Sequence, residues 1–255
     1  MAARVLTGAE VGSEVVRRVV ERALLASRPP QGTPLVETVY ETLYSEGARL
    51  ESEPVSPRRE ADQAFIGGLK HGLPRARKAE LEHMVLQIVS RYATEISGRF
   101  DPKVYALATR VLPGALGRLL GGGDVDERLL LEGELTQLRA AVMHGTVVLL
   151  PTHVSNLDSL VMGWAIYRLG LPPFAYAAGL NLFTNPGLSF FMNHLGAYTV
   201  DRKKKDPLYA ATLKEYTTVL LERGQHGLWF PGGTRSRSGA VERQLKRGLL
   251  GTAPV

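Results

Sequence analysis

From residue 145 onward, short apolar runs alternate with segments of helical character, and this alternation constrains the fold most. Four runs have the length and the apolar composition of buried strands. They are residues 146–150, 174–178, 197–200 and 227–230. Because strands that alternate with helices form parallel sheets covered by those helices, we expect an α/β fold with a mostly parallel sheet.

The preceding residues have helical periodicity instead. Apolar residues recur on one face over residues 79–97 and again over residues 9–27, which predicts two amphipathic helices. We therefore expect a helical N-terminal region over residues 1–142, followed by an α/β domain over residues 143–255.

One helix of the N-terminal region has a clear start signal. Asp124 is followed three residues later by Glu127, which resembles a capping box. Three consecutive glycines precede it and are typical of a helix end. We therefore expect a helix that begins after Asp124 and continues to about Val142.

The net charge of +6 is concentrated near the end of the sequence. Residues 201–255 carry 11 basic and 5 acidic side chains, a surplus that accounts for all of it. Residues 151–200, by contrast, carry only two charged side chains, Asp158 and Arg168. A nearly uncharged, apolar segment followed by a basic one suits a substrate with an apolar part and an anionic part.

Composition also excludes several kinds of site. The chain has no cysteine, which excludes disulfides, thiolate metal ligands and a cysteine nucleophile. His71, His83 and His144 are isolated in the sequence, and we expect neither a metal nor a cofactor. The basic segment lacks interleaved aromatic residues and any known motif, so we expect no nucleic-acid partner.

A histidine and an aspartate follow the first predicted strand. His153 and Asp158 are five positions apart, so on one continuous helix they would point in different directions. We place His153 on the turn after the strand and Asp158 in the first turn of a helix over residues 156–169, which Ser155 or Asn156 would cap. The carboxylate can then fold back onto the imidazole, and a base oriented by an acid is what deprotonation of an alcohol requires.

A glycine-rich loop follows the fourth predicted strand. It begins with Gly232-Gly233-Thr234-Arg235-Ser236. Glycines let backbone N–H groups come close to a ligand, hydroxyls add donors, and arginine pairs with phosphate through two parallel hydrogen bonds. The loop therefore predicts an anion site. The alternative is a flexible basic turn without a ligand.

Arg202 follows the third predicted strand and opens the charge run Arg202–Lys205. On its own, such a run is usually a solvated surface. In an open parallel sheet, however, ligands bind beyond the carboxyl ends of the strands. Because His153, Arg202 and the glycine-rich loop all follow strand ends, we expect them to line one crevice.

Together these residues resemble three sequence blocks of the glycerolipid acyltransferase superfamily. The blocks are His153-x4-Asp158, a glycine-to-arginine segment that ends at Arg202, and the Phe-Pro-x-Gly-Thr-Arg-Ser segment at residues 230–236. The likeness covers about residues 145–250 and is greatest to the glycerol-3-phosphate acyltransferases.

The resemblance implies an enzyme of phospholipid synthesis. It would move a fatty acyl group from acyl-CoA or acyl carrier protein to a hydroxyl of glycerol 3-phosphate. His153 would be the general base, oriented by Asp158. The acceptor phosphate would be bound by Arg202, Gly233, Thr234, Arg235 and Ser236. The alternatives are a lysophosphatidate acyltransferase and an inactive acyltransferase-like module that binds lipid.

The same resemblance implies a peripheral protein on the cytoplasmic face of a membrane, with the acyl donor, glycerol 3-phosphate and the membrane surface as partners. Two departures from the family pattern qualify it. Gly232 stands where the family usually has an acidic residue, so we expect weaker binding or positioning of the acceptor. The sequence also stops at Val255, before the family's fourth block, so we expect a truncated α/β domain or an unusually short member.

Overall fold

A computed structural model describes residues 5–28, 32–155, 157–180, 186–233, 235–236, 245 and 247–252. Contacts divide the chain into two compact units. The first unit contains Met1–Thr7, Gly98–Thr199 and Leu220–Val255, and the second contains Gly8–Ser97 and Val200–Val219. The predicted domains, 1–142 and 143–255, follow the sequence pattern rather than these contacts and stay a prediction.

The first unit contains the predicted parallel sheet, so the expected α/β fold class is confirmed. Its strands are β1 (Val148–Leu149), β2 (Ala175–Gly179), β3 (Ala197–Val200) and β4 (Gly227–Leu228), in the spatial order β1-β4-β2-β3. β4 pairs in parallel with both β1 and β2. The segments that follow β1 and β4 therefore leave neighbouring strands at the same edge of the sheet.

Two strands are shorter than the sequence predicts. The first apolar run suggested a strand over 146–150, but β1 covers only two residues, and β4 ends at Leu228 rather than at Phe230. Backbone hydrogen bonds continue one residue past the paired positions, since Trp229 N donates to Leu149 O at 3.0 Å. Phe230 lies beyond this hydrogen bond, in the loop that follows the sheet.

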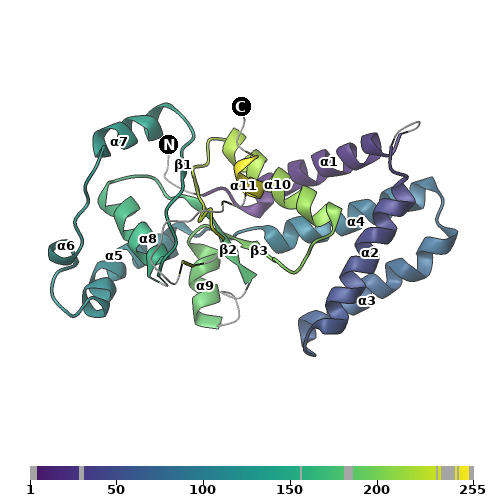
Figure 1. Ribbon diagram of the computed structural model, residues 1–255, viewed down its shortest axis with the longest axis horizontal. Coiled ribbons are helices and arrows are strands. Elements are labelled where there is room, and N and C mark those ends of the chain that lie inside the picture. The colour runs from purple at the N-terminus through teal and green to yellow at the C-terminus, as the bar shows by residue number, and fades with distance from the viewer. Residues whose placement is uncertain are drawn as a thin grey trace. The chain divides into compact units, whose positions relative to one another are not determined.

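Helices pack against one another and against this sheet (Figure 1). α5 (Pro102–Leu119) contacts both α8 (Asp158–Arg168) and α9 (Pro186–His194). Trp164 and Ala165 of α8 pack with Leu116 of α5 in one buried cluster. Ile166 of the same helix packs with Leu228 of β4 in another. α8 therefore packs on the sheet with one face and on α5 with another.

The helix expected from Asp124 to about Val142 is wrong in length. Asp124 does cap a helix, because its side chain accepts a hydrogen bond from Asp126 N at 3.0 Å. That helix, α6 (Val125–Arg128), is a single turn, and α7 (Leu135–His144) begins separately. Between them Gly133 has a φ of +118°, a conformation that ends helical geometry and favours glycine.

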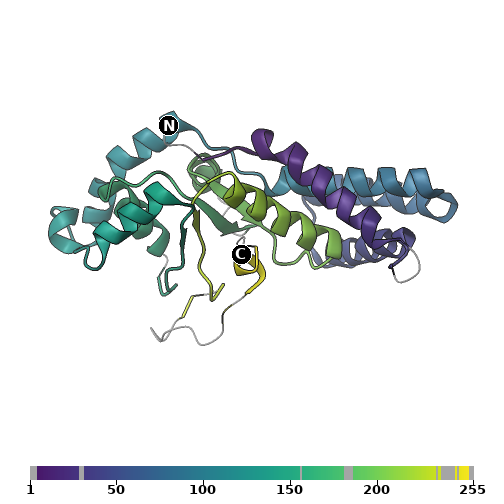
Figure 2. The ribbon, with the colours of Figure 1, turned by 90° about the horizontal axis from the view of Figure 1, so that it is seen from above.

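The second unit is a bundle of long helices. It contains α1 (Gly8–Ala26), α2 (Leu35–Ser52), α3 (Pro57–Gly72), the 3₁₀ turn Leu73–Arg75, α4 (Lys78–Ile96) and the first part of α10 (Pro207–Glu222). α1 packs along α4, and α2 contacts both α3 and α4 (Figures 1 and 2). The helices predicted over 9–27 and 79–97 are thus confirmed as α1 and α4.

One further helix lies near the end of the described residues. α11 (Arg247–Leu250) is a short helix of the first unit. Among the described residues, no helix combines the length and the apolar character that a membrane crossing requires.

Candidate active site

His153 and Asp158 are joined directly. The Nδ1 atom of His153 lies 2.6 Å from Oδ2 of Asp158. His153 lies in the loop after β1, and Asp158 is the first residue of α8, as the spacing predicts. Both side chains are largely but not fully buried, with 22% and 16% of their surfaces exposed, so a substrate can reach the pair.

The Asp158 carboxylate is built to remain ionised. Burial favours the neutral acid, but hydrogen bonds from Ser155 N, the His153 imidazole and Val154 N outweigh it and lower the pKa of Asp158 below its ordinary value. Oδ2 accepts from Val154 N at 2.7 Å and from Ser155 N at 2.8 Å. Because this oxygen is an acceptor, His153 Nδ1 carries the hydrogen of their bond, which leaves the lone pair on Nε2.

The expected helix cap is wrong in detail. The residue that precedes α8 is Leu157, and its side chain makes no cap hydrogen bond. Ser155 acts one step earlier, since its Oγ accepts from Leu157 N at 3.1 Å. Asn156 lies outside the described residues. Ser155 therefore shapes the loop between histidine and aspartate rather than the helix end itself.

The loop after β4 packs onto His153. The ring of Phe230 lies 4.3 Å from the imidazole, centroid to centroid, with 32° between their planes. Gly233 N donates to Phe230 O at 3.0 Å and closes a turn in which Gly233 has a φ of +69°. Ser236 N then donates to His153 O at 2.7 Å. The glycine-rich loop is thus held against the catalytic candidate through the backbone.

The structure brings most of the predicted phosphate-binding residues to this loop. Gly233, Arg235 and Ser236 belong to the same unit as His153, and the Arg235 side chain is exposed to solvent. Thr234 lies outside the described residues. Arg202 is exposed and belongs to the second unit, so its role beside the other residues stays a prediction.

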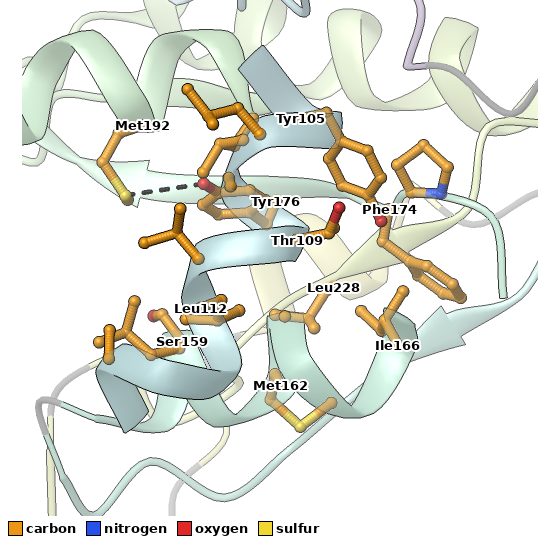
Figure 3. A pocket seen from close by; sticks show the side chains of 18 residues that line it. Tyr105, Thr109, Leu112, Ser159, Met162, Ile166, Phe174, Tyr176, Met192 and Leu228 are labelled. Atoms are coloured by element: carbon orange, nitrogen blue, oxygen red, sulfur yellow. Dashed lines mark hydrogen bonds between the residues drawn. The ribbon is translucent and has the colours of Figure 1, made fainter. Parts of the chain in front are cut away.

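The structure contains an apolar cavity of about 400 Å³, and its wall includes Ser159, the residue that follows Asp158 (Figure 3). α8 contributes five residues to its wall, among them Ser159, Met162, Gly163 and Ile166. The others come from α5, α9, β2, β4 and the segments that flank β2 and α9. This volume lies within the range of roughly 300–1,000 Å³ that is usual for small-molecule sites.

Two polar groups in this wall already have partners. Tyr176 Oη lies 3.6 Å from the sulfur of Met192, a contact that Figure 3 shows as a dashed line. Thr109 Oγ1 donates to Ala106 O of its own helix at 3.0 Å. Burial raises the pKa of Tyr176, which keeps its hydroxyl neutral. The cavity therefore suits a long apolar group rather than a charged one.

Sequence reasoning did not find this cavity. The helical spacing of Ser159, Met162, Gly163 and Ile166 marks one face of α8, but that spacing does not reveal a space between helices. Among the described residues, no three histidine, cysteine, aspartate or glutamate side chains are grouped to hold a metal ion.

Residues 133–253 match the family model described as Acyltransferase. The glycerol-3-phosphate acyltransferase of Xanthomonas axonopodis pv. citri (strain 306) is 31% identical over 160 residues, which are 62% of this chain and 17% of that protein. The glycerol-3-phosphate acyltransferase of Pseudomonas paraeruginosa (strain DSM 24068 / PA7) is 30% identical over 155 residues, 60% of this chain and 18% of that protein.

The chain spans less than a fifth of the length of these curated relatives. The matched residues contain the His153–Asp158 pair, the glycine-rich loop and most of the cavity wall. Residues 133–253, just under half of the chain, are thus similar to the Acyltransferase family, and this likeness supports the resemblance to the glycerolipid acyltransferase superfamily.

Proposed function

We propose that this chain is an O-acyltransferase that moves a fatty acyl group from a thioester, acyl-CoA or acyl carrier protein, to a hydroxyl of glycerol 3-phosphate. The observation that carries the proposal is the oriented His153–Asp158 pair, since the residues that follow it in α8 line an apolar cavity of about 400 Å³. The names of the relatives supply the acceptor, glycerol 3-phosphate.

In the proposed reaction His153 Nε2 takes the proton of the acceptor hydroxyl. The hydroxyl oxygen attacks the thioester carbonyl carbon, so that a C–O bond forms and the C–S bond then breaks. The leaving thiolate takes the proton back from the imidazolium. Asp158 stabilises that imidazolium and fixes the tautomer, since its carboxylate stays ionised and bonded to Nδ1.

The cavity would hold the acyl chain. Each methylene moved from water into an apolar wall contributes about 0.8 kcal/mol of binding free energy. The cavity wall includes Ser159, the neighbour of Asp158 in the chain, so we propose that an acyl chain bound there has its carbonyl end toward His153. The wall thus selects the chain while the pair performs the proton transfer.

The loop residues would bind the acceptor phosphate. Arg235 offers a planar, permanently charged group that can pair with a phosphate through two parallel hydrogen bonds. Hydrogen bonding of Ser236 N to His153 O ties this loop to the base, so a phosphate bound there positions its hydroxyl relative to His153.

We further propose that the chain acts as a peripheral protein on the cytoplasmic face of a membrane. Leu107, Val111 and Leu160 line the cavity although their surfaces are 56%, 58% and 39% exposed. An apolar rim of this kind suits contact with lipid, and product release into a bilayer would avoid exposing the acyl chain to water.

The proposal is tested by following thiol release from palmitoyl-CoA and palmitoyl carrier protein with a set of acceptors. Release that depends on glycerol 3-phosphate is the expected result. Release only with 1-acylglycerol 3-phosphate would assign the lysophosphatidate reaction instead. Tight binding of palmitoyl-CoA without release in the presence of any acceptor would make the chain a lipid-binding module.

A further inference from the structure

The basic run Arg202–Lys205 is not uniformly solvated. Arg202, Lys203 and Lys205 are exposed, but the Lys204 side chain retains only 1% of its surface. Its ammonium lies 2.6 Å from Glu95 Oε2 and 3.5 Å from Glu46 Oε2. Because a buried lysine charge is costly unless it is paired, these contacts fix the direction of Lys204.

Lys204 closes a ring of alternating charges within the second unit. Glu95 contacts Arg91 of α4 at 3.3 Å, and Arg91 in turn contacts Asp62 of α3. Its six members are Lys204, Glu95, Arg91, Asp62, Arg49 and Glu46. Each positive group lies between two negative ones, so the ring has no net charge.

The second half of the ring is the most deeply buried. Arg49 of α2 contacts Asp62 at 3.3 Å and Glu46 at 2.8 Å, and none of these three side chains exceeds 4% exposure. The ring therefore joins three helices of the N-terminal bundle, and Lys204 is its member in the turn that carries Arg202. Arg58 also links Glu95 to Asp201, and Glu53 links Arg49 to Lys203.

Hydrogen bonds also hold the residues on either side of Arg202 in that turn. The Tyr209 hydroxyl accepts from Asp201 N at 2.7 Å, and Asp201 Oδ1 accepts from Lys203 N at 3.0 Å. Asp206 Oδ1 accepts from Tyr209 N at 2.9 Å. The backbone around Arg202 is thus held between α10 and the bundle, while the guanidinium itself faces solvent.

We infer that Lys204 is a positioning residue, and that α2, α3 and α4 hold the turn so that Arg202 is presented as an anion-binding cation. A guanidinium on a fixed backbone loses less freedom when it pairs with a phosphate than one on a mobile loop. The inference rests on the proposed function, because glycerol 3-phosphate is the anion that the function supplies.

The test compares three variants of the chain. Lys204→Met alone leaves Glu46 with Arg49 and Glu95 with Arg91 and gives the ring a net negative charge, so this variant is expected to unfold in part. Lys204→Met combined with Glu95→Gln removes one charge of each sign, so the ring stays neutral and the bundle is expected to fold. Lys205→Met removes an exposed charge from the same turn and controls for the loss of charge alone.

Two measurements are made on each folded variant, namely amide hydrogen exchange at residues 201–204 and the Kd of glycerol 3-phosphate and of inorganic phosphate by calorimetry. In the double variant we expect exchange to be at least tenfold faster and the Kd about tenfold weaker. In Lys205→Met we expect unchanged exchange and a Kd within about threefold of the parent.

Slow exchange in the double variant, or a Kd equal to that of Lys205→Met, would overturn the inference while the proposed function stands. Binding of inorganic phosphate that is lost in Arg202→Ala, with no binding of glycerol 3-phosphate, would support the inference and overturn the proposed acceptor. Failure of both anions to bind through Arg202 in the parent chain would overturn the inference itself.

Discussion

Gly163 gives the sharpest test of the cavity as an acyl-chain site. It lines the cavity from the middle of α8, and a Cβ built at this position would lie 3.7 Å from Leu112 Cδ2, an ordinary contact. A Cβ at this position is therefore accommodated, and a larger side chain built on it is expected to extend into the cavity. Because glycine weakens a helix interior, replacement by leucine should also raise helix stability by about 0.8 kcal/mol.

The magnitude follows from the space that is filled. Leucine places four carbons in the cavity and displaces about four methylenes of a long acyl chain, at about 0.8 kcal/mol each. Gly163→Leu should therefore lower kcat/KM for palmitoyl-CoA by roughly 200-fold and leave octanoyl-CoA almost unchanged. Gly163→Ala, which adds one carbon, should lower kcat/KM for palmitoyl-CoA by about fourfold.

The assay is thiol release with the two donors at saturating acceptor, together with thermal unfolding of each variant. Gly114→Leu is the matched control, because Gly114 lies in α5, has no neighbour within 4 Å of an added Cβ and does not line the cavity. A folded Gly163→Leu chain whose palmitoyl-to-octanoyl ratio equals that of the control would show that the acyl chain binds elsewhere.

Three further changes have definite expected outcomes. Asp158→Asn should lower kcat by roughly 10,000-fold with little change in KM, because an amide favours the wrong tautomer of His153, and a KM effect alone would contradict this role. Arg235→Ala should raise the KM for glycerol 3-phosphate by at least about tenfold, with Arg235→Lys intermediate, whereas equal KM values would remove Arg235 from the phosphate site. Burial lowers the pKa of His226 below 6.5, and its Nδ1 accepts from Val147 N at 3.0 Å. Below pH 6.5 the unfolded chain binds more protons at this residue than the folded chain does. The contribution of neutral His226 to the free energy of unfolding is therefore complete above pH 6.5 and is lost as the pH falls through the folded pKa. His226→Asn keeps an acceptor, and its urea-unfolding free energy should vary less than the parent's between about pH 7 and pH 5.

The sequence predicts the α/β class and the order of elements because alternation of strands and helices depends on local pattern. The five-residue separation of His153 and Asp158 also predicts their contact, since only a turn before the helix brings both side chains together. What local pattern does not specify is where pairing stops. The end of β4 at Leu228 depends on its neighbours β1 and β2, and it is this end that frees Phe230 to pack on His153.

Packing between distant segments accounts for the other differences. The cavity exists because α5 and α8 meet around Gly163, and the sequence of either helix alone does not predict that contact. Lys204 is similar, since its neighbours in sequence are exposed, and its burial is explained by the carboxylates of α2 and α4 and by the rings of Tyr92 and Tyr209. The N-terminal helices, which have no obvious chemistry in the sequence, thereby acquire a structural link to the turn that carries Arg202.

The most direct test of the account is the rate of thiol release by His153→Ala with palmitoyl-CoA and glycerol 3-phosphate, measured beside the parent chain at equal folded concentration. General-base catalysis typically contributes about 100- to 10,000-fold, so we expect a loss of at least about 100-fold with an unchanged Kd for palmitoyl-CoA. A rate within a few-fold of the parent's would contradict the assignment of His153 as the base.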